Sequence, residues 1–367
     1  MKTVEKELPG LTCDYPLARI APAEKILFLD IETTGFTARS SCLYLIGCIY
    51  YKDGAFHLIQ WFADRYEEES EVLRAFLVFA GNFECLIHYN GNHFDIPYLE
   101  QKAAQYEMNA TLSSMEGVDI YRRIAALKNF LKLPNAKQKT VECFLGIARE
   151  DLFGGGELIG VYHDYVKQPS EHALDALLLH NADDIQGMVK LLPALAYADL
   201  YQEGVRVTKV NANYYRDFQN DARAELIMKL SLPVRLPVSI SGYANGCYFS
   251  GSGDNASLKV PLLDAELKYF YANYKDYYYL PAEDTALHKS VASFVDKEHR
   301  VQATAATCYT RKRSEYLPEW EPLFLPVFKS SYDAKETYFE LTEEFKQDRD
   351  AFASYATHVL RMIISAK

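Results

Sequence analysis

Short apolar runs alternate with segments of helical periodicity along the first 200 residues of the chain. Four runs have the length and apolar character of buried strands, namely 25–31, 43–51, 55–62 and 84–88. Between the second and third runs, Asp53-Gly54 is typical of a two-residue hairpin turn. Apolar residues recur with helical spacing in 67–80, 96–106, 121–131, 140–146 and 171–192. The pattern predicts an α/β domain in which helices flank a mixed sheet.

The pattern changes after about residue 205. Proline and glycine punctuate short β-type runs between residues 233 and 253, and sixteen of the 28 tyrosines lie beyond residue 200. We expect a helix at 281–295, strands at 300–309 and 323–329, and a closing amphipathic helix at 349–364. The predicted organisation has three parts: an N-terminal extension (1–24), the α/β domain (25–204) and a tyrosine-rich α+β accessory domain (205–367).

Composition and cysteine usage narrow the class of protein. Hydrophobic residues make up 49% and charged residues 24% of the chain, which suits a globular protein. The sequence contains no run of about 18 apolar residues, so it predicts no membrane span. Its first residues do not resemble a secretory signal. The seven cysteines are scattered and form no Cys-x-x-Cys pair. We therefore expect a cytoplasmic protein without a disulfide framework or a thiolate zinc site.

The net charge of −11 is distributed unevenly along the chain. Residues 1–200 contain 18 Lys and Arg against 28 Asp and Glu, whereas residues 201–367 contain 21 against 22. The acidic excess therefore lies in the first half. A cluster of carboxylates that holds metal ions would account for such an excess, because the cations offset the charge locally. The acidic total consequently does not exclude nucleic acid as a partner.

The end of the first predicted strand carries two carboxylates. Asp30 and Glu32 are two residues apart, so they project from the same face of a strand. Their repulsion would be relieved by a cation, and the following turn at 33–35 could direct backbone N–H groups to a phosphate or a sugar. An exposed polar strand end is the alternative interpretation.

Two further segments carry candidate acids. Asp95 follows a strand and a polar turn and stands where a helix begins, so it could be a metal ligand or only a helix cap. His180 and Asp184 are four residues apart and share a helix face. They could form a surface pair or place a proton acceptor beside a metal ligand. The neighbouring Asp183 is the less favoured candidate.

Two weaker candidates lie between these segments. Asp119 opens a predicted helix and is better explained as its cap. Lys139 could contact a phosphate or could be a solvated surface lysine.

Together these segments resemble the DEDD 3′-5′ exonuclease superfamily, and within it the YprB-like ribonuclease H-like domain. The resemblance covers roughly residues 25–195. It rests on Asp-x-Glu-Thr-Thr-Gly-Phe from Asp30, on Asn-Gly-x-x-Phe-Asp-x-Pro-x-Leu from Asn90, and on Asp184, in that order. The stretch Lys-Thr-Val-Glu-x-Phe-Leu-Gly from Lys139 is also similar to that subfamily. The resemblance implies a ribonuclease H-like fold for the first domain and a site of four acidic residues, namely Asp30, Glu32, Asp95 and Asp184.

Such a site implies metal-dependent hydrolysis. Carboxylates are hard oxygen ligands that favour Mg²⁺ or Mn²⁺ over zinc, and two ions about 3.5–4 Å apart suit in-line hydrolysis of a phosphodiester bond. Asp30 would bridge both ions. Glu32 and Asp184 would hold the ion nearer the attacking water, and Asp95 the ion near the leaving 3′-oxygen. His180 would orient or deprotonate the water.

The resemblance also supplies a partner and a direction. It implies 3′-to-5′ digestion of a nucleic acid with a single-stranded 3′ end and release of nucleoside monophosphates. The residues expected to contact the nucleic acid are Thr33, Thr34, Asn90 and Phe94.

One departure from the family keeps a second class of function open. The Tyr-type branch has a tyrosine four residues before the last aspartate, whereas the His-type branch has a histidine five residues before it. His180 is a histidine at the Tyr-type spacing. The chain could therefore be a nucleic-acid-binding or partner-binding adaptor with a degenerate nuclease site.

The second half offers one candidate interface. Its tyrosines could stack on bases and Arg311-Lys312-Arg313 could contact phosphates. Alternatively, the tyrosines pack a core and the basic triplet is a solvated turn.

Overall fold

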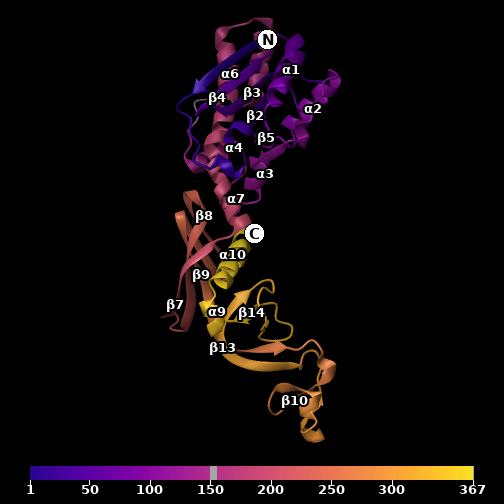
Figure 1. Cartoon of the computed structure of the whole chain (residues 1–367), viewed down its shortest axis with the longest axis vertical. Helices are drawn as coiled ribbons and strands as arrows, with labels where there is room; N and C mark the ends of the chain where they lie inside the picture. The colour runs from indigo at the N-terminus through magenta and orange to yellow at the C-terminus, as the bar shows by residue number, and fades with distance from the viewer. Residues whose placement is uncertain (149–154, 367) are drawn as a thin grey trace. The chain divides into compact units, whose positions relative to one another are not determined.

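A computed structural model describes residues 1–148 and 155–366. Their contacts divide the chain into two units, Met1–Ala198 and Asp199–Lys367. The elements of both units are labelled in Figure 1.

The first unit is built on a six-stranded mixed sheet. Its strands are β1 (Lys2–Leu8), β2 (Ile26–Thr33), β3 (Leu43–Lys52), β4 (Ala55–Phe62), β5 (Cys85–His88) and β6 (Glu116–Asp119). Their order is β1-β4-β3-β2-β5-β6, with β2, β5 and β6 parallel to one another and the other pairs antiparallel. The mixed sheet predicted from the sequence is therefore confirmed.

The strand β1 falls within the segment 1–24 that the sequence pattern treats as an extension. It pairs with β4 along its whole length and forms an edge of the sheet. Most of its residues are exposed and four of its seven are charged, as is usual for a protected sheet edge. The apolar signal of a buried strand is consequently missing from this segment.

The helices of the first unit agree with most of the predicted periodic segments. They are α1 (Glu69–Ala80), α2 (Asp95–Gln105), α3 (Ile120–Ala125), α4 (Gln138–Leu145), α5 (Gly155–Lys167), α6 (Glu171–Leu191) and α7 (Leu195–Glu203). The predicted helix at 121–131 is shorter than expected. It ends at Ala125, and hydrogen-bonded turns continue up to Leu133. The helices α5 and α7 were not predicted.

Helices α1 and α6 cover opposite faces of the sheet. On β3, Tyr50 contacts Phe79 of α1, with ring centroids 5.2 Å apart. Gly47, an odd number of positions away, faces Asn181 of α6, and alternate residues of a strand point to opposite faces. A Cβ atom at Gly47 would lie 1.9 Å from Asn181 Oδ1. The glycine therefore sets how closely α6 approaches the sheet.

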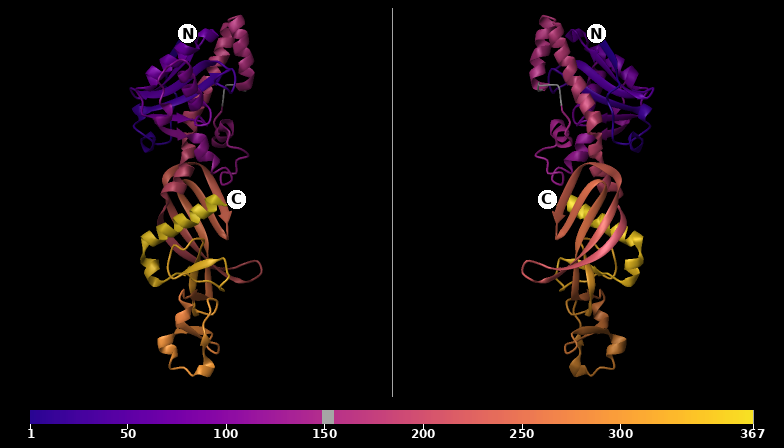
Figure 2. Two further views of the ribbon diagram at one scale, coloured as in Figure 1. Left: turned by 90° about the vertical axis from the view of Figure 1, so that its right-hand side faces the viewer. Right: turned by 90° about the vertical axis from the view of Figure 1, so that its left-hand side faces the viewer.

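The second unit contains two antiparallel sheets. The larger has the order β14-β13-β9-β8-β7 and consists of β7 (Arg206–Arg216), β8 (Ala222–Ala244), β9 (Cys247–Phe270), β13 (Tyr309–Glu319) and β14 (Thr337–Glu340). The smaller has the order β11-β10-β12 and consists of β10 (Tyr277–Leu280), β11 (Thr285–His288) and β12 (Val301–Gln302). The long helix α10 (Arg349–Ser365), predicted at 349–364, lies across β7, β8 and β9 (Figure 2). Two short helices complete the unit, α8 (Lys289–Ala292) and α9 (Glu343–Gln347).

Several predictions for the second half were wrong. Residues 222–270 form one long hairpin in place of several short strands, because Pro233 and Pro237 lie where the register between β8 and β9 shifts. Proline lacks the N–H that a regular ladder needs, and such irregularities accommodate it. The predicted helix at 281–295 is instead mostly turn and β11 before the four-residue α8. The predicted strand at 323–329 is reduced to isolated bridges at Phe328 and Lys329.

The contacts of the second half favour packing over nucleic-acid binding for the features singled out in its sequence. Tyr271 and Tyr277 stack on each other with centroids 4.5 Å apart and pack beside the buried Cys308. The basic triplet on β13 is paired with carboxylates: Arg311 with Glu266 and Asp284, Lys312 with Glu340, and Arg313 with Asp264.

All seven cysteines are free thiols. Within the described ranges, no helix has the length and apolar character needed to cross a membrane.

Replacing Gly47 by alanine tests the close approach of α6. The added methyl group collides with Asn181 and Ile185, so we expect the free energy of unfolding to fall by about 1–3 kcal/mol. Gly160→Ala is the matched control, because nothing lies within 4 Å of its Cβ position in α5. There alanine should stabilise the helix by up to about 1 kcal/mol. Urea unfolding of both variants measures the difference; equal stabilities would contradict the close approach.

Candidate metal centre

The end of β2 brings Asp30 and Glu32 to the face of the sheet that α6 covers. Asp30 pairs across the ladder with Gly47, and its Oδ2 accepts a hydrogen bond of 2.9 Å from Asn181 Nδ2. Glu32 lies two residues further on the same face and is 9% exposed. The strand therefore directs both carboxylates at one stretch of α6.

That stretch of α6 carries His180 and Asp184 one turn apart. His180 Nε2 lies 3.6 Å from Glu32 Oε1 and 3.5 Å from Asp184 Oδ2. One potential ligand atom from each of these three residues lies within 4.8 Å of the other two. His180 is 3% exposed, so the predicted surface pair with Asp184 is excluded.

Asp95 joins the group from the other side of β2. It is the first residue of α2, and its carboxylate accepts a hydrogen bond from the backbone N–H of Ile31. Ile31 lies beyond the end of the pairing between β2 and β5, which extends only as far as Phe28. The residue before the helix, Phe94, makes no side-chain cap. Asp95 is therefore placed against the strand that carries the other two acids.

Burial and mutual repulsion raise the pKa values of two of these carboxyls. Burial raises the pKa of Asp95 to about 7, although N–H donors oppose the shift and Asp119 adds to it. The side chain of Asp30 is half-buried, and protein atoms crowd its carboxyl group. Burial, followed by the charges of Glu32, Asp184 and Asp95, raises its pKa well above the usual range. All four predicted acids thus share one electrostatic environment.

This donor set fits divalent cations. Four neighbouring carboxylates that are largely buried repel one another, and a bound cation offsets that repulsion. Carboxylate oxygens are ligands that Mg²⁺ and Mn²⁺ prefer, and His180 adds a nitrogen that Mn²⁺ also accepts. Glu32, His180 and Asp184 could hold one ion, whereas Asp30 and Asp95 lie outside that trio and adjoin it.

The four residues predicted to contact nucleic acid lie near these acids in the chain. The side chains of two of them are engaged in hydrogen bonds within the protein. Thr33 Oγ1 donates to the carbonyl of Gly35, and Thr34 Oγ1 accepts from the N–H of Cys42. The half-buried Asn90 has a φ of 65° and donates its N–H to Asp119. The half-buried Phe94 packs edge-on against Phe36, with centroids 6.1 Å apart.

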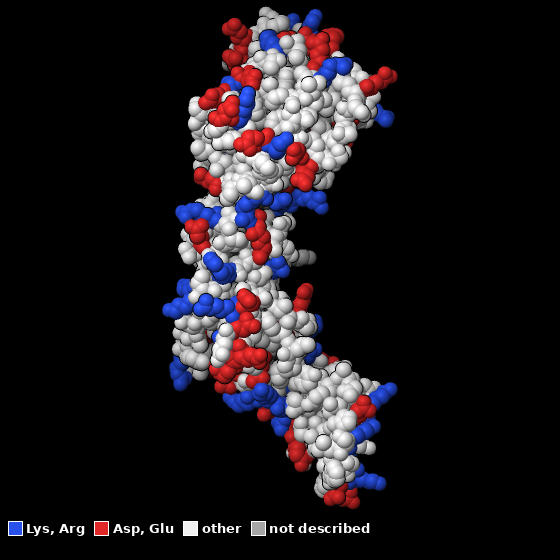
Figure 3. Space-filling model, viewed as in Figure 1, with Lys and Arg blue, Asp and Glu red and all other residues white. Residues whose placement is uncertain are grey.

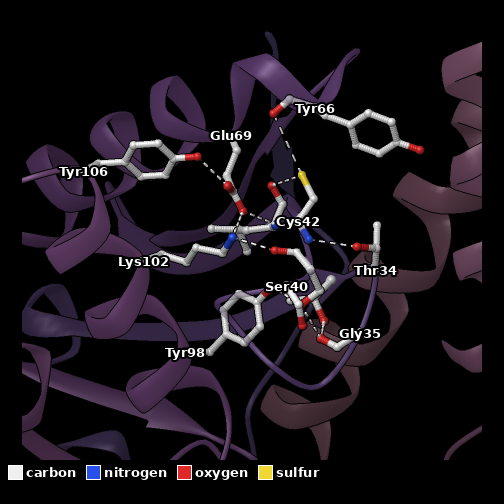
Figure 4. Close-up of polar contacts among 12 residues, drawn as sticks. Thr34, Gly35, Ser40, Cys42, Tyr66, Glu69, Tyr98, Lys102 and Tyr106 are labelled. Atoms are coloured by element: carbon white, nitrogen blue, oxygen red, sulfur yellow. Dashed lines mark hydrogen bonds and ion pairs between the residues drawn. The ribbon is translucent and has the colours of Figure 1, made fainter.

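A buried ion pair holds the loop between β2 and β3 in place (Figure 4). Lys102 Nζ of α2 lies 2.7 Å from Glu69 Oε1 of α1. The two residues are 4% and 5% exposed. The Lys102 ammonium also donates to the carbonyl of Ser41, and Glu69 accepts from the N–H of Leu43 and the hydroxyl of Tyr106. Because α2 begins at Asp95, the same helix supplies one acid and fixes the loop that follows the other two.

Sequence patterns missed the residues that support the acids. Asn181 is fully buried between Asp30 and Gln60, whose Nε2 donates to Asn181 Oδ1 over 2.9 Å. An asparagine beside His180 in the sequence was the only available signal. Asp119 has the capping role expected of it, accepting from the N–H of Arg122.

The chain was compared with protein families, curated proteins and solved structures. The family model of the RNase H superfamily matches residues 27–196. No curated protein matches the chain. Similar solved structures include a family B DNA polymerase from the hyperthermophilic archaeon Pyrobaculum calidifontis (13% identity, TM-score 0.39, covering 71% of this chain and 37% of that one). They also include two structures of E. coli exonuclease I, one with single-stranded DNA and zinc (12% identity) and one with a dA16 oligonucleotide (11% identity). Both have a TM-score of 0.28, and both matches cover 57% of this chain and 55% of the exonuclease. The chain spans about a third to a half of the length of these proteins.

The first unit is therefore a ribonuclease H-like domain. Residues 27–196, which match the RNase H superfamily, include β2 to β6 of the mixed sheet and the helices that cover it. This fold, with a possible acidic metal site at the end of β2, supports a nuclease.

The raised pKa of Asp95 predicts how stability depends on pH without metal. Between about pH 4 and pH 7, the folded protein retains a proton that the unfolded chain has released, so the free energy of unfolding falls as pH rises. Asp30 acts with the same sign. In EDTA, melting temperatures should be lower at pH 8 than at pH 5.5, and Asp95→Asn should flatten that difference. Asp53→Asn, in the exposed hairpin turn, should leave it unchanged; a pH-independent wild type would contradict the assignment.

Breaking the buried ion pair should cost more than removing it. Lys102→Met leaves the Glu69 carboxylate buried without its cation, which should lower the free energy of unfolding by about 3–5 kcal/mol. Adding Glu69→Gln removes the orphaned charge and should recover a large part of that loss. Denaturant unfolding of the single and double variants measures the coupling. A double variant whose loss equals the sum of the two single losses would argue against the pair.

Proposed function

We propose that the protein is a metal-dependent 3′-5′ exonuclease of the DEDD type that hydrolyses nucleic-acid phosphodiester bonds with two Mg²⁺ or Mn²⁺ ions. The observation that carries the proposal is the approach of Glu32, His180 and Asp184 to within 4.8 Å of one another, with Asp30 and Asp95 adjoining them. These five residues come from β2, α2 and α6. Local chain geometry alone would not bring them together.

Each residue has a proposed role. Asp30 would bridge both ions, Glu32 and Asp184 would hold one, and Asp95 the other. Bound divalent ions would activate water and stabilise the charge that develops on the phosphoryl oxygens. His180, 3.5 Å from Asp184 Oδ2, would orient the attacking water or accept its proton. Asn181 would hold Asp30 in its orientation through the hydrogen bond to Oδ2.

The 3′ end of the nucleic-acid strand would lie beside these acidic residues. Phe36 is 89% exposed, and with Phe94 it presents aromatic faces beside the acids on which a terminal base could stack. Thr33 and Thr34 shape the loop that carries Phe36, and Asn90 is held by its hydrogen bond to Asp119. These residues suit a single-stranded 3′ end.

The alternative function is an adaptor that binds nucleic acid or a partner through a degenerate site. The spacing of His180 motivates it. The contacts of His180 with both Glu32 and Asp184 favour the enzyme, because they leave its side chain among the acids where a proton acceptor is needed.

Loss of single acids tests the proposal. Asp30→Asn and Asp184→Asn should each slow Mn²⁺-dependent digestion of end-labelled oligonucleotides at least about a hundredfold, the cost of losing an electrostatic group at a reacting centre. Asp183→Asn makes the same charge change one position away on α6 and should retain activity. Mononucleotides should be released from the 3′ end of matched DNA and RNA strands. Digestion by both variants at the wild-type rate would overturn the proposal.

A further inference from the structure

One segment of the first unit carries a charge opposite to that of its surroundings. Residues 120–141 contain six of the 18 basic residues found among residues 1–200, and not one acidic residue. These six are Arg122, Arg123, Lys128, Lys132, Lys137 and Lys139. The segment, here called the basic segment, comprises α3, the turns that follow it and the first half of α4. Blue side chains gather along the edge of the first unit where Figure 1 places α3 (Figure 3).

Most of these charges are available to a ligand. Arg122, Lys132, Lys137 and Lys139 are exposed, and Arg123 and Lys128 are half-buried. In residues 1–148 and 155–366, no carboxylate forms an ion pair with Arg122, Arg123, Lys128, Lys132 or Lys137. The basic triplet of β13 differs, because each of its side chains has a carboxylate partner. Within the described residues, five of the six basic side chains thus carry positive charge that no carboxylate pairs with, in an otherwise acidic unit.

Both ends of the basic segment are tied to the candidate metal centre. At its start, Asp119 caps α3 and accepts a hydrogen bond of 3.0 Å from the N–H of Asn90. Near its end, Gln138 donates to the carbonyl of Asp184 over 2.7 Å. Between these points, the hydroxyl of Tyr89 donates to the carbonyl of Ala136. Hydrogen bonds therefore fix the two ends of the basic segment to Asn90 and Asp184, two of the predicted site residues.

The backbone of Lys132 guides the choice of substitution at this position. Its φ is 57°, a left-handed conformation that costs a residue with a Cβ atom about 1–2 kcal/mol and that asparagine or glycine adopts more readily. Asparagine should therefore remove the charge of Lys132 without a loss of stability.

We propose that the basic segment binds the phosphate backbone of the nucleic-acid strand whose end is hydrolysed at the acidic cluster. The inference rests on the proposed function only in taking that cluster as the reaction site. Five cations without an ion pair exceed what a single phosphate group needs, so the proposed ligand is an extended polyanion and not a mononucleotide. Their attraction for an incoming strand reaches about 8 Å in physiological salt.

Three neutral substitutions test this binding surface. The variant Arg122→Gln, Lys132→Asn, Lys137→Gln removes three exposed charges, and Lys132→Asn also relieves its backbone conformation. The control Lys6→Gln, Lys52→Gln, Arg74→Gln removes three exposed charges from β1, β3 and α1. Affinity for a fluorescent single-stranded oligothymidylate of about 15 nucleotides is measured in EDTA over a series of salt concentrations. Melting temperature is recorded for both.

The expected result is a loss of affinity of about tenfold or more at low salt for the basic-segment variant. Its slope of log affinity against log salt should become shallower by about 2, because single strands contribute about 0.7 per phosphate contact. The control should bind within about twofold of the wild type. Lys132→Asn alone should weaken binding without lowering the melting temperature. Equal affinity of the two triple variants would overturn the inference, as would displacement of the oligonucleotide by polyglutamate of equal charge.

A small substrate separates this inference from the proposed function. Hydrolysis of the p-nitrophenyl ester of thymidine 5′-monophosphate needs the acidic cluster but no long strand, so its rate should be unchanged in the basic-segment variant. Hydrolysis of the ester with unchanged oligonucleotide affinity would refute the inference alone. Loss of oligonucleotide affinity in a protein that never hydrolyses either substrate would support the inference and refute the proposed nuclease.

Discussion

Burial of carboxyl groups beside one another at the end of β2 is the constraint on which the rest of the first unit depends. Protein atoms surround Asp30 and Asp95, and the pKa values of both are raised mainly by that burial. A chain free to relax would separate such charges, because their repulsion grows as water is excluded. The fold prevents this with contacts that are individually ordinary. Asn181 donates to Asp30, the backbone of Ile31 donates to Asp95, and Gly47 lets α6 approach the sheet.

The supports of the cluster are coupled through a few buried polar groups. Gln60 of β4 holds Asn181, so a strand two places from β2 influences the orientation of Asp30. Lys102 connects α2 to the loop after β2 and to Glu69 of α1. Buried charges of this kind contribute little net stability, but they penalise any arrangement in which one partner is lost. They therefore define one position for the helices relative to the strands, which is what a metal centre built from three elements requires.

Local signals in the sequence predicted the elements whose causes are local. Asp53-Gly54 and the apolar runs beside it became the hairpin of β3 and β4, and the amphipathic segment 349–364 became α10. The acids of the site were recognisable because each lies in a short motif. Gly47, Gln60 and the Glu69–Lys102 pair could not be found in this way, since their partners are distant in sequence. In the second unit, Pro233 and Pro237 indicated breaks, yet the long hairpin absorbs them through shifts in register.

The distribution of charge explains why an acidic chain can serve a polyanionic substrate. Hydrolysis of a phosphodiester requires carboxylates for the cations, and those carboxylates repel the phosphates that must reach them. Two remedies are available, and they act at different distances. Bound cations neutralise the acids where the reaction would occur, whereas the proposed basic segment attracts the strand from its flank. Asp119 and Gln138 fix that segment beside the acids. The net charge of −11 is therefore compatible with a polyanionic substrate, because an incoming strand responds to the charges near its path more than to the sum over the chain.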